Sequence, residues 1–157
     1  MPQLAVVKRV LLAEGLLEVE VPDDWVVRAT TLQDGQRVDV ASPERYAEWQ
    51  LQDLPEDVGT VVHRTHEPLE VVAERSMRRH VGNGEPDRFH ERVGSVAARG
   101  YAWTDGVRDI ATWFAQPISG IVVAIYVSLP GLLDPSRTHR DPVARGRMLL
   151  GSARWIE

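Results

Sequence analysis

Histidines and acidic residues are the side chains of this sequence whose types could support chemistry. His63 and His66, followed directly by Glu67, have the residue types of a metal site. On a strand, residues three positions apart point to opposite faces, so this pair would need a bend to converge on one ion. We therefore predict no metal site here.

The other candidate groups have simpler interpretations. His80 stands near the end of a predicted helix, where a histidine interacts with terminal carbonyls, and His90 follows on the other side of a loop. Asp105 precedes a glycine in a turn signal, and Asp109 stands beside an arginine near a strand end. No serine lies in a nucleophile elbow and no glycine-rich loop has phosphate-binding spacing. We predict no catalytic residues and no cofactor.

Composition narrows the class of protein. The 157 residues are 43% hydrophobic and 26% charged, with a mean hydropathy of -0.23, which is typical of a globular domain. We expect one domain over residues 1–157. The chain has no cysteine, so disulfides, thiolate chemistry and lipidation at cysteine are excluded. A net charge of -5 argues against nucleic acid as the partner.

One uncharged run, residues 110–133, is long enough to cross a membrane. Prolines and glycines divide it, and its parts alternate like strands. The N-terminal residues lack the long apolar core of a secretory signal. We expect no membrane insertion and a cytoplasmic location.

Strand and helix signals follow each other along the chain. Alternation in Leu17–Val21 is typical of a half-buried strand. Further strands are expected over residues 25–32, 36–42 and 59–66, and either a strand or a helix over 4–13. Helices are expected over 43–51, 68–81 and from 141 to about 151, the last with Ala144, Met148 and Leu149 facing inward. Residues 153–157 would add an edge strand or pack Trp155 over a sheet end.

The region 96–130 predicts an antiparallel meander of three strands. Turn signals at Asp105-Gly106 and at residues 117–120 divide it into β-branched and aromatic runs. With a two-residue first turn, Thr104 pairs with Val107, and the resulting sheet has two unlike faces. The bulky face collects Tyr101, Trp103, Ile110, Phe114, Val123, Ile125 and Val127. The small-residue face collects Ala98, Gly100, Ala102, Ala111, Trp113, Ala115, Val122, Ala124 and Tyr126. A slip of one residue at either turn would exchange residues between the faces.

The bulky face is suited to hold the helix over 68–81. The small-residue face allows a helix to approach the backbone closely. Either the C-terminal helix of the same chain covers it, or part of it is a groove for a partner or ligand. The residues that we predict to bind a partner are Ala102, Ala111, Trp113, Ala124 and Tyr126, together with two aromatic residues of an acidic segment, Tyr46 and Trp49. The last two could equally cover the sheet edge, and residues 43–58 could form a helix or an interaction loop.

Three stretches together resemble the PsbP-like superfamily: GLLEVEVPDDWVV near the start, EPLEVVAERSMRRH in the middle, and GSVAARGYAWTDGVRDIATWFAQPISGIVVAIYVSLP followed by a closing helix. The likeness is one of pattern over nearly the whole chain. It implies an α/β class (α+β), an α/β/α sandwich whose central antiparallel sheet is flanked by helices. Members of the family are mostly non-catalytic and include the photosystem II extrinsic subunit, a Ran-binding nuclear import factor and type VI effector chaperones.

Three hypotheses about function follow. The first is a non-enzymatic cytoplasmic adaptor or chaperone of bacterial type, which binds an apolar segment of a protein such as a secreted effector, with homodimerisation as a further option. The second is a small-molecule-binding domain or enzyme with a pocket between sheet and helix. The third is an immunity protein that blocks a toxin through the acidic residues 44–57.

Overall fold

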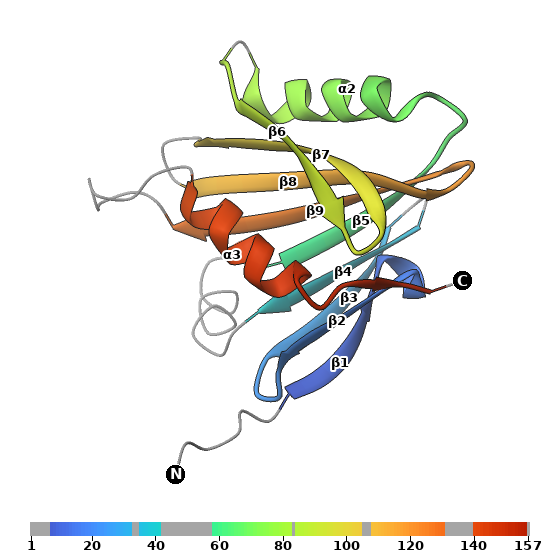
Figure 1. Ribbon diagram of the computed structural model, residues 1–157, viewed down its shortest axis with the longest axis vertical. Coiled ribbons are helices and arrows are strands. Elements are labelled where there is room, and N and C mark those ends of the chain that lie inside the picture. Colours follow the sequence, from blue (N-terminus) through green and yellow to red (C-terminus); the bar gives the residue numbers. More distant parts are fainter. Residues whose placement is uncertain are drawn as a thin grey trace.

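The computed structural model of the protein describes residues 7–32, 35–41, 58–82, 84–104, 108–130 and 140–156 (Figure 1). The strands are β1 (Val7–Leu12), β2 (Leu17–Pro22), β3 (Val26–Leu32), β4 (Gly35–Ala41), β5 (Val58–Arg64), β6 (Asp87–Val93), β7 (Val96–Thr104), β8 (Arg108–Ile118), β9 (Ile121–Pro130) and β10 (Arg154–Trp155). The helices are the short 3-10 turn η1 (Ala13–Gly15), α2 (Leu69–Val81) and α3 (Arg140–Leu150). Over these residues the protein is mainly β. The expected helix at 43–51 lies outside the described residues.

Two antiparallel sheets hold the strands. The large sheet has the order β3-β4-β5-β9-β8-β7-β6, and a small sheet has the order β1-β2-β10. The predicted central antiparallel sheet is thus confirmed, and so is the edge strand at the C-terminal tail, since Arg154 and Trp155 pair with Glu18 and Leu17. None of the described helices is long and apolar enough to cross a membrane.

The meander of β7, β8 and β9 is confirmed, but its first turn is longer than predicted. Thr104 pairs with Asp109, not with Val107. Because the loop is longer by two residues, an even number, each side chain of β8 still points to the predicted face. Ala102 therefore pairs with Ala111, and Trp103 with Ile110, on the faces that the sequence predicted.

The predicted faces of β9 were wrong. The second turn has two residues, because Ile118 pairs with Ile121. A β-bulge follows at once, in which two residues of β8, Gln116 and Pro117, stand opposite one residue of β9. Because of this extra residue, each side chain of β9 points to the face opposite to the one predicted. Its residues Val123, Ile125 and Val127 join the small-residue face, and Val122, Ala124 and Tyr126 join the bulky face.

Each face of the large sheet is covered by a different part of the chain. The helix α2 buries Val72, Ala73 and Met77 against Tyr101 and Phe114 on the bulky face, as predicted. The helix α3 lies across β8 and β9 on the opposite face (Figure 1). Its buried residues Val143, Leu149 and Leu150 share a core with the small sheet. The inward positions predicted for Ala144 and Met148 were wrong, since both are exposed.

The small sheet is tied to the large one by the turn η1. Ala13 and Glu14 have φ of 53° and 56°, in the left-handed region that L-residues rarely adopt. The turn is held because the buried Ala13 N–H donates to Thr60 Oγ1 of β5 at 2.8 Å. An ion pair of 3.1 Å between Arg64 and Glu14 adds to this link.

Candidate functional site

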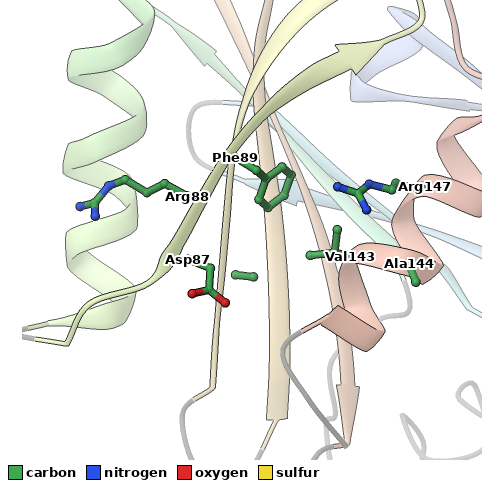
Figure 2. Close-up of a pocket in the computed structure, with 7 residues that line it drawn as sticks. Asp87, Arg88, Phe89, Val143, Ala144 and Arg147 are labelled. Carbon is green, nitrogen blue, oxygen red and sulfur yellow. The ribbon is translucent and has the colours of Figure 1, made fainter.

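A pocket lies between β6, the outer strand of the large sheet, and the helix α3. Its volume is about 680 Å³, within the range of ligand sites. We call it the β6–α3 pocket. The residues that line it are Asp87, Arg88, Phe89, Ala102, Val143, Ala144 and Arg147 (Figure 2).

The floor of the pocket depends on small residues of β7. The Phe89 ring lies directly over Gly100, where a Cβ atom would come within 2.0 Å of the ring. Ala102, the second small residue of this floor, pairs with Asp87 of β6. The Phe89 ring also packs edge-on against Trp113, with the ring centroids 5.7 Å apart. A larger residue at position 100 or 102 would fill the space that Phe89 and the pocket share.

The wall formed by α3 is fixed to the sheet by Trp113 and Glu91. Gly146 of α3 sits so close to Trp113 that an added Cβ would lie 2.1 Å from the indole ring. The buried Trp113 indole N–H donates to Glu91 Oε1 at 2.5 Å, and Arg147 Nε donates to Glu91 Oε2 at 2.9 Å. One carboxylate thus connects β6, β8 and α3. These contacts fix α3 against the sheet beside the pocket.

The two arginines of the pocket differ in direction. Arg147 reaches from α3 toward Phe89, with its guanidinium 5.8 Å from the ring centroid (Figure 2). Arg88 extends from β6 to the other face, where it bonds Glu74 of α2 and Glu85. These hydrogen bonds from Arg88 hold the pKa of both carboxyls below the usual value.

The carboxyl of Glu74 also accepts a hydrogen bond from the Tyr101 hydroxyl at 3.1 Å. Burial, with this bond as a second cause, raises the pKa of Tyr101. The group formed by Glu74, Arg88 and Tyr101 joins α2 to the edge of the sheet. It has the character of a structural network and lies on the face opposite α3.

The residues predicted to bind a partner do not form one surface. Ala102 lines the β6–α3 pocket, whereas Ala111 and Trp113 are fully buried beneath α3. Ala124 is buried on the α2 face, and Tyr126 is partly exposed there. Tyr46 and Trp49 lie outside the described residues. Of the predicted residues, Ala102 is the one that lines the β6–α3 pocket.

The histidines and aspartates considered for chemistry are dispersed. His63 is on β5, His66 lies beside Gly120 in the exposed segment after it, and His80 stacks on Trp103 at 6.3 Å between ring centroids. Asp109 is buried near the end of β8. Asp105 lies outside the described residues. No group of three or more potential metal ligands comes together in the part of the chain that the structure describes.

Sequence reasoning missed Asp87, Phe89 and Arg147 as pocket residues. A signal for the first two was present, since Phe89 and Val93 have the even spacing of one strand face, and a strand over DRFHERV would place Asp87 on that side as well. The structure begins this strand at Asp87. No sequence signal connects Arg147 to Glu91.

The comparisons with known proteins show the fold alone. No protein-family model matches the chain, and no curated protein matches it. Among solved structures, a crystal structure of a protein from Bacteroides thetaiotaomicron VPI-5482 at 1.50 Å resolution is similar, with a TM-score of 0.53 and 7% sequence identity. The match covers 96% of this chain and 48% of that one. This chain therefore spans about half the length of that protein.

Proposed function

We propose that the protein is a non-enzymatic adaptor or chaperone that holds an apolar segment of a partner protein in the β6–α3 pocket. The observation that carries the proposal is the β6–α3 pocket, which reaches the Ala102 end of the small-residue face. That end is next to the outer strand of the sheet, so an extended segment can reach it from the side.

The lining of the pocket supports binding more than catalysis. Phe89, Ala102, Val143 and Ala144 offer an apolar surface for one or two side chains. Its described lining residues include no histidine, serine or lysine. Arg147 is engaged by Glu91 in an ion pair of 2.9 Å.

We further infer a PsbP-like α/β/α sandwich and a cytoplasmic location. The sandwich is supported by one helix on each face of the central antiparallel sheet. The location is supported by the absence of cysteine from the sequence. A second candidate function, binding of a small molecule in the same pocket, is favoured by the pocket volume.

The proposal is tested by blocking the pocket from its exposed wall. Ala144→Trp would fill the pocket from α3 without entering the core, since Ala144 is exposed. The matched control is Met148→Trp, on the same helix but outside the pocket lining, where the side chain is 78% exposed. Each tagged variant would be purified from the native host and its co-purifying proteins identified by mass spectrometry.

We expect wild type and Met148→Trp to retain one specific partner and Ala144→Trp to lose it. Recovery of the same partner by all three variants would place the binding site elsewhere. Recovery of no partner by any of them would overturn the adaptor function.

A further inference from the structure

We infer that the β6–α3 pocket selects a partner segment that carries a lysine or arginine two positions from its apolar anchor residue. The inference rests on the proposed function and adds the charge selectivity of the same site. It follows from which charges around the pocket are paired within the chain and which are not.

Both arginines of the pocket are already paired. Arg147 forms an ion pair of 2.9 Å with Glu91. Arg88 forms ion pairs of 3.2 Å with Glu74 and with Glu85. An acidic group on a ligand would have to compete with these carboxylates, so the pocket offers little attraction to anions.

The Asp87 carboxylate is different, because it has no ion pair or hydrogen bond with any residue that the structure describes. It is exposed and stands at the pocket, two positions along β6 from Phe89 (Figure 2). A cation that accompanies an apolar side chain onto Phe89 and Val143 would be within reach of it. A partly desolvated charge pair at such a rim favours one sign of ligand charge over the other.

A second carboxylate lies beyond the floor of the pocket. Asp109 is 6% exposed, and its Oδ2 atom has no hydrogen-bond partner in the described part of the chain. The Thr104–Asp109 pair lies two positions beyond the Ala102–Ala111 pair in the register. Strand alternation therefore puts Asp109 on the same face as Ala111. Asp109 and Asp87 together place two carboxyl groups at the Ala102 end, which favours cations over anions there.

The form of the site favours a peptide as the occupant. The pocket borders β6, which pairs only with β7 among the described strands and so has one unpaired edge. Extended segments bind beside such edges and place alternate side chains into adjacent pockets. The apolar anchor would occupy the space over Phe89, and a basic residue two positions away, on the same side of the extended segment, would face Asp87.

The test is selection from a displayed library of random peptides on wild-type protein, with binders of Ala144→Trp removed first. The same selection is run on Asp87→Asn and Asp87→Lys, which alter an exposed side chain and should leave the fold intact. Selected peptides are then resynthesised with the basic residue replaced by glutamine, and affinities are compared by fluorescence anisotropy at low and high salt.

We expect wild type to enrich peptides with an apolar residue two positions from lysine or arginine, and the glutamine version to bind about fivefold more weakly at low salt. The difference should vanish in Asp87→Asn, and Asp87→Lys should enrich acidic peptides. Enriched apolar peptides without a charge preference would overturn this inference and leave the proposed function standing. If no peptide is enriched, the peptide-binding function itself fails, and binding of hexylamine in that case would identify a small amine as the occupant.

Discussion

The indole N–H of Trp113 on β8 donates to the carboxylate of Glu91 on β6, across β7, the one strand between them in the large sheet. Trp113 is fully buried, and its ring also fixes the position of α3 through Gly146. The same carboxylate binds Arg147 of that helix. Contacts of Trp113 and Glu91 with α3 therefore help to fix where the helix lies beside the β6–α3 pocket.

Loss of the Glu91 carboxylate should destabilise the protein. Glu91→Ala leaves the buried Trp113 N–H without an acceptor, and we expect the free energy of unfolding to fall by about 1–3 kcal/mol. Glu91→Gln keeps a carbonyl acceptor and should lose less. Urea denaturation followed by circular dichroism measures both. Equal losses for the two variants would show that the hydrogen bond to Trp113 is not the cause.

The addition of a single methyl group to α3 should also destabilise the protein. Glycine to alanine within a helix normally stabilises it by about 1 kcal/mol. In Gly146→Ala the new Cβ would lie 2.1 Å from Trp113, so we expect instead a loss of about 1–3 kcal/mol. The loss should shrink in a Trp113→Phe background, because the ring atoms in conflict are then removed. Thermal unfolding of the four proteins gives the double-mutant cycle, and an additive result would contradict the proposed contact.

Thr60→Val tests the connection between the two sheets. The substitution preserves shape but removes the acceptor of the buried Ala13 N–H, so stability should fall by about 1–3 kcal/mol. Thr60→Ser keeps the hydroxyl and should retain the hydrogen bond. The comparison is made by urea denaturation. A valine variant as stable as wild type would mean that the strained turn is held by other contacts.

The Glu74 network should make stability depend on pH in the acid range. The Arg88 hydrogen bond lowers the pKa of Glu74 below 4.5, so its contribution is complete above that value and is lost as the pH falls through the folded-state pKa. We expect Glu74→Gln to be about 0.2–1 kcal/mol less stable than wild type at neutral pH, the size of a partly exposed ion pair. Unfolding curves across this range should show the two proteins converging in acid. A difference that stays constant with pH would exclude ionisation of Glu74 as its source.

Much of the local structure could be predicted, because the spacing of apolar residues that is typical of strands or helices can be recognised within short stretches of sequence. Leu17–Val21 alternates and forms β2, and the apolar stripe of residues 69–81 forms α2. The faces of β7 and β8 were also correct, since a first turn longer by two residues does not change the phase of alternation. The pocket was less accessible to prediction, because Ala102 was recognised but Asp87 and Phe89 were not placed opposite it.

The sequence by itself determined that segments such as 17–21 and 25–32 are strands and that 69–81 is a helix, and that β7 and β8 have one bulky and one small-residue face. Only the tertiary structure decided the sides of β9, because a bulge at Gln116 and Pro117 depends on pairing between strands and leaves no periodic signal. It also decided where the pocket lies. The position of α3 depends on contacts of Gly146 with Trp113 and of Arg147 with Glu91, residues far apart in the chain, and such long-range packing is not encoded in any local pattern.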